Sequence, residues 1–192
     1  MKPSQKDIDR YYLLHESERL FFRNLEESDI ERWIPFFEDE ETLSHVGMLS
    51  GPFKFLGNPD RSRAWLLKQM ERRKKGVFGQ LAVVEKETQK FIGVGGIIFR
   101  EEKEAYGEWE IAYSLLPEAR GRGYATELAR YFRDWAFANT EVESLVSFVH
   151  VNNSASQKVT EKNGMHVEKE LTFFEMPCRL NRVIRGEVDV VG

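Results

Sequence analysis

The feature that most constrains the fold is an abrupt change from a strand pattern to a helix pattern. Residues 109–116 (WEIAYSLL) are typical of a strand. From Ala125, apolar residues recur at helical spacing over more than two turns, which predicts an amphipathic helix. Gly121 and Gly123 lie between the two patterns. The chain must therefore place a strand, a tight glycine turn and a helix directly after one another.

The remaining segments continue this mixture along the chain. Strands are expected over residues 20–25, 80–85, 91–99, 109–116, 144–149, 167–174 and 183–190, and helices from residue 28, from about residue 61, over 125–136 and over 153–162. Short polar connections join the three strands over residues 80–116, which predicts an antiparallel meander. This element order predicts an α+β (mixed α/β) fold.

Local patterns refine three of these elements. Ser28 and Glu31 form a capping-box pattern at the start of the first helix. The second helix is expected to turn Ala64, Trp65, Leu67 and Met70 inward. Glycines 93, 95 and 96 lie inside an expected strand, which indicates a bulge or a close neighbour.

Composition excludes several classes of protein. The 192 residues carry a net charge of −4 and are 41% hydrophobic, so we expect one packed domain and neither a disordered chain nor a nucleic-acid-coating protein. The lone Cys178 excludes an intrachain disulfide and a cysteine-rich zinc site, and it is a poor candidate nucleophile. No stretch approaches the roughly 18 apolar residues of a membrane span. We therefore expect a cytoplasmic protein without a membrane partner.

Two charged runs have more than one interpretation. The basic run at residues 72–75 precedes Gly76, where cations favour a helix C-terminus, although it also suits phosphate contacts. The acidic run at residues 38–41 is typical of a solvated face, although it also suits a cationic substrate.

The turn before the long helix carries the most chemical information. Backbone N–H groups around Gly121 and Gly123 can converge on an anion, and the helix adds its unpaired N-terminal donors. No Lys-Ser or Lys-Thr follows, which excludes a nucleotide-triphosphate loop, and Thr126 stands where a dinucleotide fingerprint needs glycine. A phosphate cradle and a plain tight turn both remain open. The side chains of Arg120 and Arg122 either assist the cradle or are solvated.

Two motifs resemble those of the GCN5-related N-acetyltransferase (GNAT) family, and in particular its ribosomal-protein-alanine (Rim-type) branch. Residues 120–125 (RGRGYA) fit the family pattern [Gln/Arg]-x-x-Gly-x-[Gly/Ala]. The second motif is matched by Asn153, Ser156, Val159, Glu161, Lys162 and Gly164. Arg19 and Leu20 are similar to the start of the family's first strand, so the resemblance spans roughly residues 18–175.

This resemblance implies a fold and a set of ligand contacts. The fold would be a single domain over residues 1–192, with an extension at 1–17 and a twisted, mostly antiparallel sheet of about seven strands, flanked by about four helices and holding acetyl-CoA in a splayed strand pair. The implied acetyl-CoA contacts are Tyr113, Ser114 and Leu115 for the pantetheine arm, Arg120, Gly121, Arg122, Gly123, Tyr124, Ala125 and Thr126 for the pyrophosphate, and Asn153 and Ser156 near the thioester. No metal is implied.

Acetyl transfer to nitrogen needs a neutral amine and a proton for the departing thiolate. Strand alternation places Glu110 on one face with Ala112 and Ser114, so Glu110 is the candidate base, and Glu108 is the substitute on the same face. A solvated, non-catalytic Glu110 remains the alternative. Thr160 occupies the position at which many family members carry a tyrosine that acts as the general acid.

A second catalytic position also departs from the family pattern. Phe148 occupies the position of a strand glutamate found in some members. Since the tyrosine is missing too, Ser156 or water is left as the proton donor, and Ser156 is the candidate catalytic acid.

The function that this resemblance implies is acetyl-CoA-dependent acetylation of a primary amine by direct transfer. The acceptor stays open among protein N-termini, amino acids, polyamines and aminoglycosides, and a homodimer is allowed. Aromatic residues of segment 30–60 and of the last hairpin, namely Trp33, Phe36, Phe37, Phe53, Phe55, Phe173 and Phe174, either line the acceptor site or belong to the core. A non-catalytic acyl-CoA-binding regulator is the alternative function, and a nucleic-acid-binding module lacks support.

Overall fold

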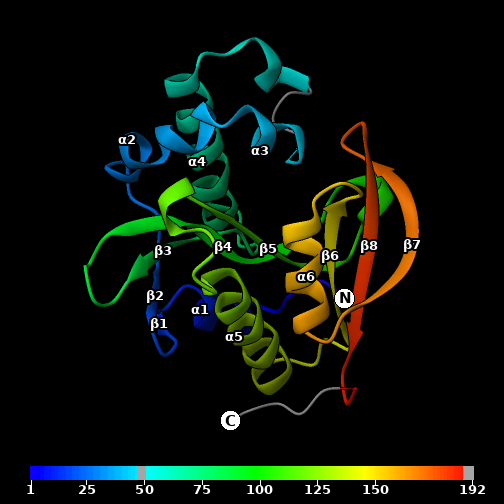
Figure 1. Ribbon diagram of the computed structural model, residues 1–192. Coiled ribbons are helices and arrows are strands. Elements are labelled where there is room, and N and C mark those ends of the chain that lie inside the picture. Colours follow the sequence, from blue (N-terminus) through cyan, green and yellow to red (C-terminus); the bar gives the residue numbers. More distant parts are fainter. Residues whose placement is uncertain (47–50, 188–192) are drawn as a thin grey trace.

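The computed structural model describes residues 1–46 and 51–187 (Figure 1). Within these residues, eight strands form one sheet in the order β1-β2-β3-β4-β5-β6-β8-β7. The strands are β1 (His15–Glu16), β2 (Leu20–Arg23), β3 (Leu81–Glu85), β4 (Phe91–Phe99), β5 (Trp109–Leu115), β6 (Ser144–His150), β7 (His166–Phe173) and β8 (Met176–Ile184). The α-helices are α1 (Gln5–Tyr11), α2 (Asp29–Trp33), α3 (Glu40–Ser44), α4 (Asn58–Lys74), α5 (Tyr124–Asn139) and α6 (Ser154–Lys162).

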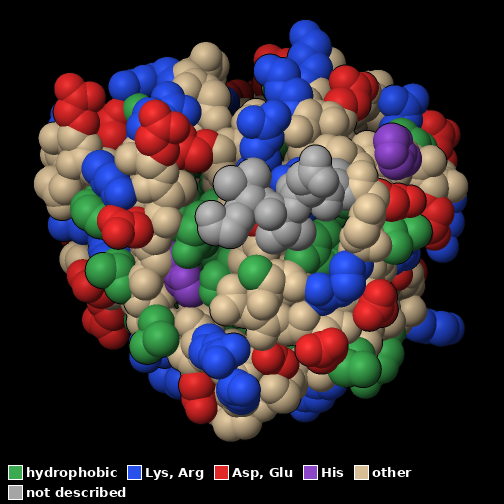
Figure 2. Space-filling model, turned by 90° about the horizontal axis from the view of Figure 1, so that it is seen from below, with side chains coloured by type: hydrophobic (Ala, Val, Ile, Leu, Met, Phe, Trp, Pro, Cys, Tyr) green, Lys and Arg blue, Asp and Glu red, His purple; other side chains and the backbone are tan. Residues whose placement is uncertain are grey.

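The expected mixed α/β fold and the antiparallel meander of β3, β4 and β5 are confirmed. Every neighbouring pair of strands is antiparallel except β5 and β6, which are parallel. No helix in the described part of the chain is both long enough and apolar enough to cross a membrane. On the face shown in Figure 2, cationic and anionic side chains are interspersed rather than gathered by sign.

Helices cover both faces of the sheet at its centre. One core cluster joins α1 and α5 to one face through residues such as Ile8, Leu128 and Phe132. The other joins α2 and α4 to the opposite face through residues such as Trp33 and Leu66. Consequently β4 is buried along its whole length, whereas β7 lies at the edge of the sheet and is mostly exposed.

Both features expected at the glycines of β4, a bulge and a close neighbour, are present. The register of β3 and β4 shifts between Val83 and Val84, opposite Gly93. A Cβ on Gly95 would overlap the Leu128 side chain, and a Cβ on Gly96 would overlap the hydroxyl of Tyr11. The strand therefore needs glycine so that elements on one face can approach its backbone.

The segment at residues 1–17, expected as an extension outside the core, packs into it. Tyr11 is fully buried in the larger core cluster. Its hydroxyl donates to the Gly79 carbonyl at 2.8 Å and accepts from the Ile97 amide at 2.8 Å. These bonds tie α1 to β4 and to the residues that lead into β3.

Of two sequence-based expectations for the helices, the capping box is wrong and the inward face of α4 is only partly confirmed. Ser28 makes no capping hydrogen bond; the buried Asp29 instead pairs with Arg23 at 2.7 Å and accepts from the Glu26 amide. In α4, the residues that are buried are Ser62, Leu66, Gln69 and Arg72, while Leu67 is exposed. Trp65 and Met70 do pack against the core as expected, so the expectation fails at Leu67 and omits the polar side chains that are buried on this helix.

The last strand is also misplaced in the sequence-based assignment. It begins at Met176 rather than at residue 183, and residues 188–190 lie outside the described residues. Phe174 and Glu175 form the preceding turn with positive φ angles of 48° and 62°. A turn without glycine or asparagine gives no sequence signal, and Pro177 argued against a strand.

Replacing Tyr11 with phenylalanine should destabilise the protein by about 1–3 kcal/mol, because the change leaves buried backbone groups unpaired while keeping the ring. The free energy of unfolding in urea measures this effect. Tyr106→Phe is the control, since Tyr106 is 73% exposed. Equal stability of the two variants would contradict the structural role of the Tyr11 hydroxyl.

Candidate functional site

The two central parallel strands separate immediately after they meet. Among the described residues, only Glu110 and Val146 form a register pair between β5 and β6. The Ser147 hydroxyl adds one bond, which it donates to the Ile111 carbonyl at 2.7 Å. By contrast, β5 pairs with β4 along its whole length, from Trp109 to Leu115. The later residues of β5 therefore turn a free edge toward β6.

The glycine turn before α5 forms an open cradle of amide groups. Gly121 and Gly123 have φ angles of +74° and +83°, and Gly123 is the N-cap without a side-chain capping bond. Within the part of the chain that the structure describes, the amides of residues 123–126 meet no protein acceptor. A Cβ on Gly121 would meet no atom within 4 Å. Positive φ explains the glycines, and the unpaired amides leave room for an anion.

Protein partners already hold the two arginine side chains of this turn. Arg120 donates to the Leu115 carbonyl at 3.0 Å and pairs with Asp39. Arg122 pairs with Glu85 at 2.8 Å and lies over the Tyr124 ring. The cradle is therefore built from backbone groups.

Asp39 belongs to the acidic run at residues 38–41, and the structure gives it a structural role. It is the N-cap of α3, where its side chain accepts from the Thr42 amide at 3.2 Å. Hydrogen bonds from Thr42 and from Arg120 lower the pKa of Asp39 to about 2. This carboxylate is consequently engaged within the protein rather than offered to a substrate.

Arg19 lies beside the cradle, a position that the sequence did not reveal. Its guanidinium donates to the Arg122 carbonyl at 3.0 Å and pairs with Glu127 at 2.7 Å. It also lies 4.6 Å from the centre of the Tyr124 ring. The turn is thus fixed from the side of β2, which is remote from it in sequence.

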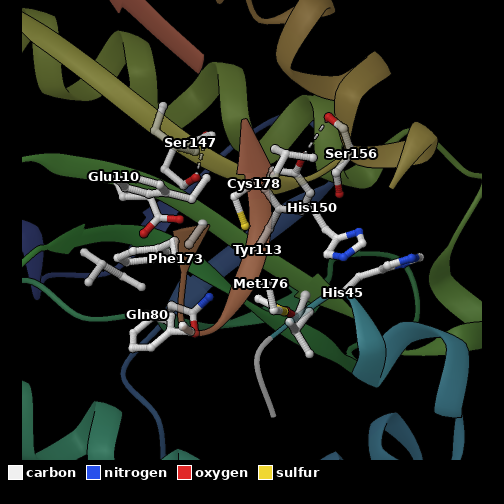
Figure 3. Close-up of a pocket in the computed structure, with 18 of the residues that line it drawn as sticks. His45, Gln80, Glu110, Tyr113, Ser147, His150, Ser156, Phe173, Met176 and Cys178 are labelled. Atoms are coloured by element: carbon white, nitrogen blue, oxygen red, sulfur yellow. Dashed lines mark hydrogen bonds between the residues drawn. The ribbon is translucent and has the colours of Figure 1, made fainter. Parts of the chain in front are cut away.

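A cavity of about 280 Å³ lies where β5 and β6 diverge (Figure 3). Five of the sequence-predicted site residues line it: Glu110, Tyr113, Ser114, Asn153 and Ser156. The residues of the cradle and Leu115 do not line it. Cys178 lines the cavity too, and burial raises the pKa of its thiol to about 11, which disfavours a nucleophilic thiolate.

Glu110 lies in the cavity wall at the point where the strands part. It is 4% exposed and forms an ion pair with Arg100, which also lines the cavity. Burial raises the pKa of Glu110, while the Arg100 guanidinium opposes this shift. Glu110 is therefore not a solvated strand residue, and its carboxylate is paired with Arg100. Glu108 lies outside the cavity lining and pairs with Arg182 at 2.7 Å.

The start of α6 brings Asn153 and Ser156 together. Asn153 caps the helix by accepting from the Ser156 amide at 3.0 Å. The Tyr113 hydroxyl lies 3.5 Å from the Ser156 carbonyl oxygen, and burial raises the pKa of Tyr113. Thr160 is buried outside the cavity lining, and its hydroxyl donates to the Gln157 carbonyl at 2.8 Å. Thr160 thus does not replace the missing tyrosine.

Two histidines that showed no sequence pattern also line the cavity. The rings of His45 and His150 lie 5.0 Å apart between centroids (Figure 3). Nδ1 of His150 accepts from the Asn152 amide at 3.1 Å. Burial and the nearby His45 lower the pKa of His150. Within the described residues, no group of three or more His, Cys, Asp or Glu side chains is arranged to hold a metal ion.

The aromatic residues divide between the cavity and the core. Phe53, Phe173 and Phe174 line the cavity, and Phe148 stacks on Phe173 with centroids 4.2 Å apart. The others named from the sequence lie elsewhere: Trp33, Phe36 and Phe37 are buried in the core, and Phe55 is 88% exposed. Residues of the 30–60 segment and of the β7–β8 hairpin therefore share one cavity.

Comparison with known proteins assigns the family. The profile of the family described as "Acetyltransferase (GNAT) domain" matches residues 19–166. The chain belongs to this family. It is 29% identical over 147 residues to the uncharacterized protein YkkB of Bacillus subtilis (strain 168), covering 73% of this chain and 84% of that protein.

Solved GNAT structures share the fold. The GNAT-family acetyltransferase from Bacillus anthracis matches with a TM-score of 0.71 and 18% identity, covering 90% of this chain and 99% of that one. Mycobacterium smegmatis RimJ in complex with CoA-disulfide matches with a TM-score of 0.70 and 17% identity, covering 88% and 83%. The expected GNAT fold is thereby confirmed for this chain, and RimJ is one of the solved structures that share it.

Gly123→Ala tests whether this turn holds the pyrophosphate of acetyl-CoA: if it does, the affinity for acetyl-CoA should fall at least tenfold, because the new Cβ strains the turn that presents the amides. Calorimetry measures the affinity. Gly107→Ala is the matched control, since Gly107 has a similar φ of +88° and open space around it. Equal affinity of the two variants would contradict the cradle.

Proposed function

We propose that this protein transfers an acetyl group from acetyl-CoA to a primary amine, either a protein N-terminus or a small molecule. The observation that carries this proposal is the row of unpaired amides at residues 123–126, placed at a helix N-terminus beside a splayed strand pair. Such a terminus favours phosphate groups through both its donors and its dipole. The likeness to RimJ, whose structure contains CoA, supports the same assignment.

The residues present fit acetyl-CoA along three segments. The backbone of residues 121–126 would hold the pyrophosphate, and the free edge of Tyr113, Ser114 and Leu115 would pair with the amides of the pantetheine arm. Asn153 and Ser156 would lie near the thioester, since both line the cavity that opens beyond this edge. When bound, acetyl-CoA supplies an activated acetyl group, so no covalent enzyme intermediate is needed.

Glu110 is the proposed base, because it is the carboxylate among the described cavity-lining residues. It takes a proton from the acceptor ammonium, directly or through a water, and leaves the amine neutral. Ser156 is the proposed donor to the departing thiolate, because its helix begins at the cavity and Thr160 is engaged elsewhere. Arg100 keeps Glu110 oriented through their ion pair.

A non-catalytic acyl-CoA-binding regulator is the second candidate. It is favoured by the ion pair that occupies Glu110 and by the hydrogen bond that occupies Thr160. Thiol release from acetyl-CoA with a panel of amines distinguishes the two functions. Tight acetyl-CoA binding without release on any amine supports the regulator.

Glu110→Gln should lower turnover by about 10²- to 10⁴-fold while leaving acetyl-CoA affinity within a few-fold. A base works only when deprotonated, so the rate should rise as the pH increases through the pKa of Glu110. Since burial raises this pKa, the rise should lie above the range of an ordinary glutamate, and the variant should lose it. Steady-state rates across pH measure both effects.

Glu108→Gln is the matched control for this experiment, because Glu108 immediately precedes β5 and lies outside the cavity lining. It should retain turnover and the pH profile. Wild-type turnover of Glu110→Gln would exclude Glu110 as the base and leave deprotonation to bulk water.

Ser156→Ala should slow acetyl transfer while leaving CoA binding nearly unchanged, if the hydroxyl assists the departing thiolate. The loss should be smaller with a thioester whose thiol has a lower pKa, because a better leaving group needs less help. Comparing kcat for the two thioesters tests this role. An equal loss with both thioesters would assign Ser156 a structural role in α6.

A further inference from the structure

The lining of the cavity is positively charged although the whole chain carries a net charge of −4. Among the described residues, three cationic side chains line it, Lys68, Arg72 and Arg100, against the single carboxylate of Glu110. Lys68 and Arg72 lie four residues apart on α4 and so share one helix face. The excess of positive charge is thus concentrated on the side of the cavity that α4 covers.

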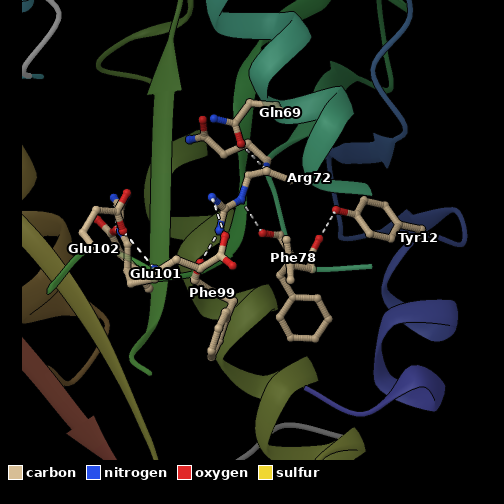
Figure 4. A network of polar contacts seen from close by, with 11 residues as sticks. Tyr12, Gln69, Arg72, Phe78, Phe99, Glu101 and Glu102 are labelled. Atoms are coloured by element: carbon tan, nitrogen blue, oxygen red, sulfur yellow. Dashed lines mark hydrogen bonds and ion pairs between the residues drawn. The ribbon is translucent and has the colours of Figure 1, made fainter. Parts of the chain in front are cut away.

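Arg100 has a carboxylate partner at hydrogen-bond distance, whereas Arg72 has none among the described residues. Arg100 pairs directly with Glu110. Arg72 is 8% exposed and donates to two neutral groups, the Phe78 carbonyl at 2.8 Å and the Phe99 carbonyl (Figure 4). Its nearest carboxylate, that of Glu101, lies 3.9 Å away on a side chain that is 53% exposed.

Other acidic groups near this wall do not face the cavity. Glu101 and Glu102 follow β4 and lie outside the lining, and Glu102 is 3.4 Å from Arg100. Glu102 interacts electrostatically with Lys68, and both glutamates interact with Arg72, so they offset part of the positive charge. On the cavity side, Lys68 is exposed, and no carboxylate in the described part of the chain lies within 4 Å of its ammonium. The Lys68 ammonium is therefore available to a ligand.

From this arrangement we infer that the acceptor is a small amine that also carries an anionic group, a carboxylate or a phosphate, which binds at Lys68 beside Arg72. This inference rests on the proposed acetyl transfer. The amine of such a molecule would lie toward Glu110 and Ser156, and its anionic group toward α4. Polyamines and aminoglycosides are disfavoured, because additional positive charges would face the α4 cations.

A ladder of acceptors tests the charge preference. The probes are ω-amino carboxylates from glycine to 6-aminohexanoate, each paired with its carboxamide, together with 2-aminoethylphosphonate and 1,4-diaminobutane. One charge-assisted hydrogen bond should raise kcat/KM about ten- to hundredfold for the anionic member at the best chain length. Relative rates of the carboxylates and the phosphonate distinguish the two anions. Equal rates for acids, amides and the diamine would overturn the inference.

Variants of Lys68 locate the preference. Lys68→Met should raise KM for the anionic acceptor to that of its carboxamide with little change in kcat, and Lys68→Arg should retain the preference. Lys68→Glu should shift it toward 1,4-diaminobutane. Lys74→Met is the matched control, because Lys74 is on the same helix, is 75% exposed and lies outside this lining. An equal loss for acid and amide in Lys68→Met would contradict an anion site there.

Calorimetry on the CoA complex separates this inference from the proposed function. Tighter binding of the amino acid than of its amide, lost in Lys68→Met, supports the anion site even if no amine is acetylated. In that case the proposed acetyl transfer would be wrong and the site would stand. Equal or undetectable binding of both molecules would overturn the site, whether or not acetyl transfer occurs.

Discussion

The short stretch of pairing between β5 and β6, with one register pair among the described residues, is the constraint on which the rest of the site depends. The strands are joined by the pairing of Glu110 with Val146, by the Ser147 bond to Ile111 and by a hydrogen bond from the Phe148 amide to the Glu110 carboxylate. Beyond this point the strands must be covered by other elements, and α6, the β7–β8 hairpin and α4 supply that cover. Glu110 lies where the strands part; burial there raises the pKa of its carboxyl, and its ion pair with Arg100 opposes that shift.

Most of the cradle was predictable because its causes are local. The glycines at residues 121 and 123 adopt positive φ, and the helix that follows has a clear apolar period. The same reasoning located the meander and the glycine-rich β4, since strand alternation and short connections involve neighbouring residues. It failed at Phe174 and Glu175, where the turn is formed by residues that seldom adopt positive φ.

The charged wall of the cavity was not predictable, because its members come from distant segments. The basic run that begins at Arg72 was expected either to favour the helix C-terminus or to contact phosphate, yet the Arg72 guanidinium is buried against the carbonyls of Phe78 and Phe99. Arg100 did leave a signal: it follows β4 directly, its amide donates to the Glu108 carbonyl, and its side chain forms a cross-strand ion pair with Glu110. His45 and His150 left none, since only tertiary packing brings their rings together.

Arg120 shows why a motif match does not by itself assign a role to a side chain. It occupies the first position of the phosphate motif, yet its guanidinium bonds the Leu115 carbonyl and pairs with Asp39 at the start of α3. The helix that Asp39 caps ends beside His45, which lines the cavity. Arg120 therefore connects the end of β5 to the start of α3, and in the proposed function the amides of the turn, rather than this guanidinium, would bind the phosphate. The motif therefore predicts the backbone geometry of the turn, whereas its arginine side chain links two parts of the protein.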